Sequence, residues 1–217
     1  MLREITLLIK KDLTSELRRS HVMGGIFLYL ASTVFVVFLA LFEVEPVVWV
    51  SLYWIVILFT VVNAVAKSFL QESRGRWIYF YHLVSPKAVI FSKMIYNSLL
   101  GILLCTAGFF IFTLVIGNPM NHSGYFLFVS VVGTLSLVLV FTLMSAIAQQ
   151  AGGSVAMMAI LGLPLIIPSL MLLIHLSVEG LRIQDFPFPW RDTGLLLSVD
   201  VLVVTLGWLL FPYLWRE

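Results

Sequence analysis

The stretch of sequence that decides the fold runs from Met94 to Val178 and reads MIYNSLLGILLCTAGFFIFTLVIGNPMNHSGYFLFVSVVGTLSLVLVFTLMSAIAQQAGGSVAMMAILGLPLIIPSLMLLIHLSV. It contains no Asp, Glu, Lys or Arg in 85 residues. A helix crosses a bilayer with about 20 apolar residues, so this stretch is too long for one or two crossings. Two clusters of turn residues, at 117–124 and 149–153, divide it. We therefore predict three spans, near 94–116, 125–148 and 154–175.

The flanking sequence adds three more uncharged runs. Two precede the central stretch, near 22–42 and 47–66, with a short turn between them that holds Glu43, Glu45 and Pro46. The sixth, near 195–214, follows a charged, proline-rich loop at 176–193. The chain is 61% hydrophobic and 11% charged, whereas a soluble domain carries roughly 25% charged residues. This composition excludes a soluble globular domain and predicts an all-α, polytopic membrane protein, with one transmembrane domain over 1–217.

The N-terminal segment 2–20 differs from the six runs because charges alternate with apolar residues. The apolar positions recur every three or four residues and line one face of a helix: Leu2, Ile5, Ile9, Leu13 and Leu17. The polar face carries Arg3, Lys10, Lys11, Arg18 and Arg19. We expect an amphipathic helix that lies in the membrane interface, the alternative being a helix packed on a partner protein.

The basic residues indicate the orientation. With six spans, eleven of the thirteen Lys and Arg residues fall on one side: five in the N-terminal segment, five in 67–93 and one at the C-terminus. Only Arg182 and Arg191 fall on the other side. Cytoplasmic loops carry the excess of Lys and Arg, so we expect both termini and the 67–93 loop in the cytoplasm, and the chain in the cell inner (cytoplasmic) membrane.

Several kinds of chemistry are missing from the sequence. It has no Gly-x-x-x-x-Gly-Lys-Ser/Thr nucleotide loop, no His-Glu-x-x-His and no Gly-x-Ser-x-Gly. Its single cysteine, Cys105, provides neither a disulfide framework nor a cysteine-rich metal site. We therefore expect the chain not to be an enzyme by itself, with no catalytic residues, no metal site and no cofactor bound directly.

The 67–93 loop is the segment most suggestive of function. It combines charged, aromatic and turn residues: Glu72, Arg74, Gly75, Arg76, Trp77, Tyr79, Phe80, Tyr81, Ser85 and Pro86. Aromatic and Arg side chains are the usual anchors of protein–protein contacts, which favours a short helix that docks into another protein. The same aromatic residues also suit a loop that lies among lipid headgroups, so both interpretations stay open.

A resemblance to a known family supports the first interpretation. Glu72-x-x-Gly75, the aromatic Trp77 and then Leu83-x-Ser85-Pro86 resemble the cytoplasmic loop of ABC-2-type exporter permeases. In that family the loop between the second and third spans forms a coupling helix, which docks on an ATP-binding subunit. The interfacial N-terminal helix and the six spans also fit this architecture. The resemblance thus implies an ATPase-coupling role for the loop residues named above, with ATP bound by the partner subunit.

Within this group the chain resembles the CcmB family, the membrane (permease) subunits of the cytochrome c maturation, or haem exporter, system. Leu163-Pro-Leu-Ile-Ile-Pro168 is similar to that family's Leu-Pro-Leu-x-Ile-Pro, and 86–93 is similar to its entry into span three. The resemblance implies haem export, or ATP-driven release of a haem-loaded chaperone. It also implies a homodimer with a CcmA-like ATPase and with CcmC- and CcmD-like membrane proteins. Ile78 departs from the family pattern, which often has Glu there, so a coupling role of that Glu cannot be carried over.

Four residues within the predicted spans are further candidates. Pro164 and Pro168 should kink or break the fifth span, because each removes an amide donor. Asp200 is either an intramembrane charge or, if span six begins later, a headgroup residue. His175 is the one histidine near an expected haem path, though a histidine at a helix end also suits an ordinary hydrogen-bonded role.

Two rival functions remain open at this point. One is an ABC-2 permease for another substrate, such as a lipid, a glycan or a drug. The other is a membrane assembly scaffold without ATPase coupling. The apolar spans exclude neither.

Overall fold

The fold was obtained as a computed structural model that describes residues 2–18, 20–41, 44–70, 84–150, 154–182 and 188–214. Within these ranges the chain forms seven helices and no strand. They are α1 (Leu2–Arg18), α2 (Ser20–Ala40), α3 (Pro46–Leu70), α5 (Pro86–Val115), α6 (Ser123–Gln150), α7 (Val155–Glu179) and α8 (Trp190–Leu214). Six of the seven, all except α1, are long and apolar enough to cross a membrane. This confirms the predicted all-helical chain with six apolar helices.

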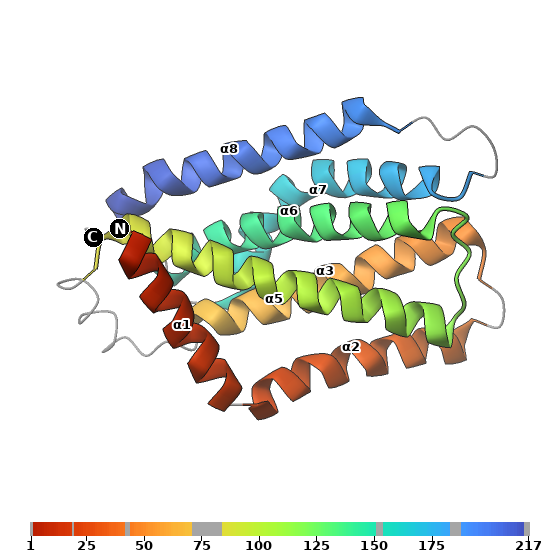
Figure 1. The fold of residues 1–217 in the computed structure, drawn as a ribbon, viewed down its shortest axis with the longest axis horizontal. Helices are drawn as coiled ribbons and strands as arrows, with labels where there is room; N and C mark the ends of the chain where they lie inside the picture. Colours follow the sequence, from red (N-terminus) through yellow and green to blue (C-terminus); the bar gives the residue numbers. More distant parts are fainter. Residues whose placement is uncertain are drawn as a thin grey trace.

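The six long helices run side by side, and α1 lies steeply inclined to them at one end (Figure 1). We call this the α1 end; α3 ends there and α5 begins there. At the opposite, far end, α5 connects to α6 and α7 leads toward α8. The central helix is α6, which packs against α3, α5, α7 and α8. In its span 67% of the residues are buried, against 17% in α2, so α6 holds the bundle together from within.

Several helices extend further than the sequence indicated. The third span begins at Pro86 rather than at residue 94, and the second continues to Leu70 rather than 66. At the far end the fifth span continues to Glu179 and the sixth begins at Trp190. The predicted 67–93 and 176–193 loops are therefore shorter. Charged residues had been taken as loop residues, but a helix end accommodates charges that find partners, as Glu179 does with Arg182 at 2.7 Å.

The start of α5 also follows a local rule. Ser85 precedes the helix in an extended conformation, with φ −67° and ψ 136°, and Pro86 is its first residue. Proline suits this position because its fixed φ is already helical and because its missing N–H would have no partner within the helix.

An aromatic cluster at the far end packs α3 against its neighbours. Trp49 and Tyr53 of α3 stack with ring centroids 5.6 Å apart, and Phe112 of α5 and Phe126 of α6 lie edge-on to both. Trp49 donates a hydrogen bond from Nε1 to the Gly117 carbonyl at 3.0 Å. Gly117 has φ +99°, a conformation that glycine adopts readily and other residues rarely do. The cluster fixes the turn after α5 relative to α3.

Candidate functional site: a clamp between α1 and the bundle

An acidic row on α1 faces the bundle. Glu4, Asp12 and Glu16 are spaced by multiples of four residues, with Leu8 between the first two, so all four lie on one helix face. Leu8 and Asp12 are buried, at 8% and 7% exposure, whereas Leu13 of the predicted apolar stripe is 51% exposed. Within the predicted apolar stripe Leu13 therefore points outward and Ile5 and Ile9 are only half-buried, whereas the acidic row contacts the bundle. The sequence analysis missed this row, although its spacing was visible.

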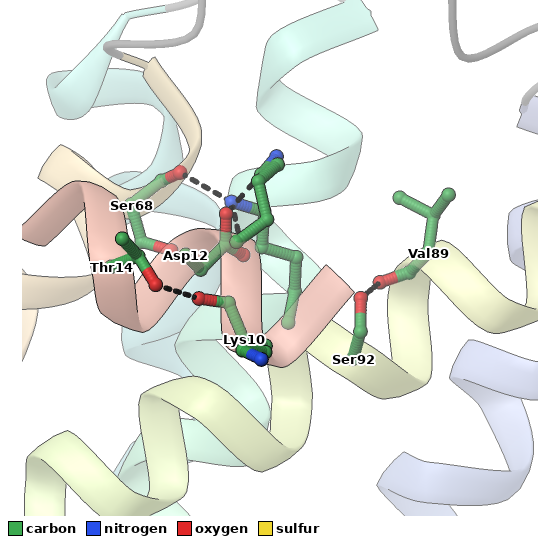
Figure 2. A network of polar contacts seen from close by, with 8 residues as sticks. Lys10, Asp12, Thr14, Ser68, Val89 and Ser92 are labelled. Carbon is green, nitrogen blue, oxygen red and sulfur yellow. Dashed lines mark hydrogen bonds and ion pairs between the residues drawn. The ribbon is translucent and has the colours of Figure 1, made fainter. Parts of the chain in front are cut away.

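The central contact of the row is a buried ion pair. Lys93 of α5 places its Nζ 3.1 Å from Asp12 Oδ2, and the two side chains are 5% and 8% exposed. The same Nζ donates to the backbone carbonyl of Ser68 in α3, also at 3.1 Å. Figure 2 shows Asp12 of α1 and Ser68 of α3 close together around this contact. Lys11 lies 3.0 Å from the other carboxylate oxygen and is 38% exposed. One lysine thus connects three helices.

The second contact is at the first turn of α1. Glu4 Oε2 accepts hydrogen bonds from the Ser85 hydroxyl at 2.9 Å and from the Ser85 backbone N–H at 3.3 Å. These bonds, the hydroxyl bond first, lower the pKa of Glu4. Ser85 makes no side-chain cap of its own at the start of α5. A carboxylate at a helix N-terminus is favourable because the helix dipole is positive there, so Glu4 of α1 performs this role for α5.

The third contact joins Tyr96 of α5 to Glu16, with the phenol donating to the carboxylate. We call the set of Glu4, Asp12, Glu16, Ser85, Lys93, Tyr96 and the Ser68 carbonyl the α1 clamp. Its contacts fall on both sides of 71–83: Ser68 precedes this segment and Ser85 follows it. The clamp therefore fixes the two helix ends from which the segment departs.

The residues predicted to form the coupling loop fall into two groups. Ser85 belongs to the α1 clamp, and Pro86 begins α5. The others lie outside the described residues: Glu72, Arg74, Gly75, Arg76, Trp77, Tyr79, Phe80 and Tyr81.

The two prolines of the fifth span do not divide it. The helix α7 runs without interruption from Val155 to Glu179 with Pro164 and Pro168 inside it. Each proline removes a single hydrogen bond, and the bonds of the flanking turns keep the helix continuous. Both prolines are exposed on the surface of the single chain, so no described part of the chain covers them. A kink without a break remains a prediction.

The remaining two candidates lie apart from the clamp and from each other. Asp200 is 9% exposed and follows the first residue of α8 by ten positions, about 15 Å along the helix. That depth places it in the middle of the bundle rather than at the far end. His175 lies at the far end, where its Nδ1 is 3.0 Å from Asp192 Oδ2 of α8. Its side chain is 64% exposed.

Six long apolar helices, with α6 at their centre, indicate a multi-pass membrane protein. The comparisons with known proteins do not assign the chain to a family, because no family model, no curated protein and no solved structure matches it. Among the described residues, no three His, Cys, Asp or Glu side chains are grouped so that they could hold a metal ion.

Proposed function

We propose that this chain is the transmembrane subunit of an ABC-2-type transporter complex, similar to the CcmB family. Its partner would be a CcmA-like ATPase that binds to 71–83 in the cytoplasm, with the chain in the cell inner membrane as a homodimer. The observation that carries the proposal is the α1 clamp. A segment that receives force from another protein needs firm attachment at both ends, and the clamp provides it through Ser68 and Ser85.

The path of the force follows from the packing. A push on 71–83 reaches α3 and α5 directly, because these helices continue from its two ends. Lys93 and Asp12 make α1, α3 and α5 respond together, since the one ammonium contacts all three. Both α3 and α5 pack on the central helix α6. ATP hydrolysis in the partner would in this way rearrange the transmembrane spans so that they open toward the extracytoplasmic side.

The distribution of basic residues supports the same orientation. The described Lys and Arg residues of the α1 end are Arg3, Lys10, Lys11, Arg18, Lys67, Lys87 and Lys93. Those of the far end are Arg182 and Arg191. The excess of positive charge on cytoplasmic segments favours the α1 end, and with it 71–83, as the cytoplasmic side.

The proposed task is haem export, or ATP-driven release of a haem-loaded chaperone, with CcmC- and CcmD-like proteins as further partners. It rests on the resemblance of 163–168 and 86–93 to the CcmB family. Haem enters this proposal as a substrate, with ATP on the partner subunit. Deleting the gene and measuring c-type cytochromes separates this task from transport of a lipid, glycan or drug, because normal cytochrome levels would exclude it.

The coupling itself is tested by co-purification in lipid nanodiscs together with ATPase measurements. Trp77→Ala should weaken association with the ATPase and lower the stimulation of ATP hydrolysis. The matched control is Trp190→Ala, which removes a tryptophan that is 77% exposed at the far end and should leave both quantities unchanged. If the chain never associates with an ATPase, or if the two variants behave alike, the scaffold alternative is favoured instead.

A further inference from the structure

A carboxyl group lies in the middle of the apolar bundle. Asp200 of α8 is 9% exposed, and its Oδ1 has no hydrogen-bond partner among the described residues. Its carboxyl group lies beside the hydroxyl of Ser136 in α6. Ser136 follows the first residue of α6 by thirteen positions, about 20 Å along that helix. Both groups therefore lie far from the helix ends, at a depth at which a bilayer is apolar.

The helices packed on α8 are α5, α6 and α7, and their ionisable groups have partners elsewhere. On α5, the Lys87 ammonium lies 4.2 Å from the ring centroid of Trp208, which is eight residues from Asp200 toward the α1 end. Lys93 and Tyr96 belong to the α1 clamp. The buried thiol of Cys105 is 3.3 Å from the Tyr53 hydroxyl.

The ionisable groups of α6, α7 and the first turn of α8 also lie away from Asp200. On α6, Tyr125 in the first turn donates to the Leu176 carbonyl at 3.1 Å. On α7, His175 contacts Asp192 and Glu179 contacts Arg182, all at the far end. On α8 itself, Arg191 and Asp192 occupy the first turn. Among the described residues, the polar side chain beside the Asp200 carboxyl group is therefore that of Ser136.

The burial of the carboxyl group and the hydrogens at this contact together favour the protonated state. Ser136 has one hydroxyl hydrogen, and its Oγ is positioned 3.4 Å from the Val132 carbonyl to donate it there. A carboxylic acid at Asp200 would donate its own hydrogen to Ser136, so that all three groups form one chain of bonds. An ionised carboxylate would need donors for two oxygens and would find a single one. An uncompensated charge in hydrocarbon is also costly.

We propose that Asp200 is a proton-binding site at the contact between α6 and α8, held as a carboxylic acid that donates to Ser136. This inference does not depend on the proposed transport function. The proton stays while α8 packs on α6. Any rearrangement that separates the two helices and admits water at Asp200 releases it, because water then solvates the carboxylate. Bundle opening and proton release are thereby coupled in this chain.

Chemical modification tests the site directly. Dicyclohexylcarbodiimide dissolves in membranes and reacts with protonated carboxyl groups: the carboxyl oxygen bonds to the central carbon, and the carboxyl proton moves to a carbodiimide nitrogen. The adduct rearranges to an N-acylurea without loss of atoms. With the full chain in lipid nanodiscs at neutral pH, peptide mass spectrometry should find this adduct at Asp200. It should be absent at Asp192, and Asp200→Asn should remove it. Modification of Asp192 without modification of Asp200 would overturn the proposal.

Infrared spectroscopy supplies a second measurement that needs no reagent to reach the site. The spectrum of the wild-type chain should contain a protonated-carboxyl band that is lost in Asp200→Asn and retained in Asp192→Asn. Ser136→Ala keeps the carboxyl group but removes its acceptor, so the band should persist and shift toward that of a free carbonyl. This variant serves if Asp200→Asn does not fold. Absence of the band from the wild-type spectrum at neutral pH, or its insensitivity to both Asp200→Asn and Ser136→Ala, refutes the assignment.

Discussion

Replacing Lys93 by methionine is the most informative perturbation of the α1 clamp. Methionine keeps most of the volume of the side chain but removes the ammonium. Asp12, whose side chain is 8% exposed, then loses its contact at 3.1 Å, and the Ser68 carbonyl loses its donor. Because only the clamp is affected, the expected result is release of α1 from α5 while the six long helices keep their packing.

The size of the effect follows from the burial of the pair. Removing one partner of a buried ion pair costs about 3–5 kcal/mol, because the other charge stays buried and unpaired. Lys11 still contacts Asp12 at 3.0 Å and is partly exposed. The loss should therefore fall at the lower end of that range, about 3 kcal/mol, which is roughly a hundredfold shift in the equilibrium between docked and released α1.

Hydrogen exchange in lipid nanodiscs measures this equilibrium segment by segment. In Lys93→Met, amides of 2–18 should exchange roughly a hundredfold faster than in the wild type, while those of α6 should not change. The matched control is Lys10→Met, because Lys10 is an exposed lysine of α1 outside the clamp. It should leave the exchange of α1 unaltered.

A double variant separates loss of the ion pair from loss of packing. Replacing both charges, with Asp12→Leu and Lys93→Met together, leaves no buried charge without a partner, so exchange of α1 should return to within about tenfold of the wild type. If Lys93→Met leaves exchange of 2–18 unchanged, or if the double variant is worse than the single one, the buried ion pair does not hold α1 against the bundle.

Three further predictions concern other contacts. The Ser85 bonds lower the pKa of Glu4, so this contact is fully present above the ordinary glutamate pKa of 4.5 and is lost as the pH falls through the lower folded value. The distribution of distances between spin labels on α1 and α5 should therefore broaden in that acidic range. Glu4→Gln should broaden the same distribution at neutral pH. Trp54→Phe removes the donor that bonds Ser177 Oγ at 2.8 Å and should lower the free energy of unfolding by about 1 kcal/mol. Gly133→Ala places a methyl group against the Trp54 and Leu173 side chains and should cost about 1–3 kcal/mol, measured by thermal unfolding in detergent.

Each of these three predictions has its own control. A Glu4→Gln chain whose distance stays narrow at neutral pH and broadens with acid like the wild type would assign the transition to another group. Trp190→Phe, at an exposed tryptophan, should leave the free energy of unfolding unchanged. Gly124→Ala should also be neutral, because no atom lies within 4 Å of the added methyl. Equal stability of the Gly133 and Gly124 variants would contradict the close packing of α6 against α3 and α7.

The sequence predicted the number of long helices well because a bilayer demands a minimum apolar length. It predicted their ends less well, since a charge was read as the end of a span. Lys93 shows why this fails: it lies within α5 and is buried, and its partner Asp12 is 81 positions earlier in the chain. A hydropathy average over a local window of sequence cannot include so distant a partner. The depth of Asp200 was underestimated for a related reason, because α8 begins at Trp190 in a segment that looked like loop.

The α1 clamp could have been predicted in part. The spacing of Glu4, Asp12 and Glu16 placed three acids on one face of a helix whose other charges are basic. These acids were not predicted to face the bundle, because an amphipathic helix usually turns its apolar stripe toward protein or membrane. Their partners Ser85, Lys93 and Tyr96 become known only when the packing of α1 on α5 is known.

The measurement that tests the central claim most directly is site-specific photo-crosslinking in native membranes. A crosslinking amino acid at Trp77, between the two clamped helix ends, is compared with one at Leu114, which is 83% exposed at the far end. The proposed function predicts that an ATP-binding subunit with a Gly-x-x-x-x-Gly-Lys-Ser/Thr loop is crosslinked from position 77 and not from position 114. An ATPase that is captured from neither position, or equally from both, would contradict coupling through 71–83.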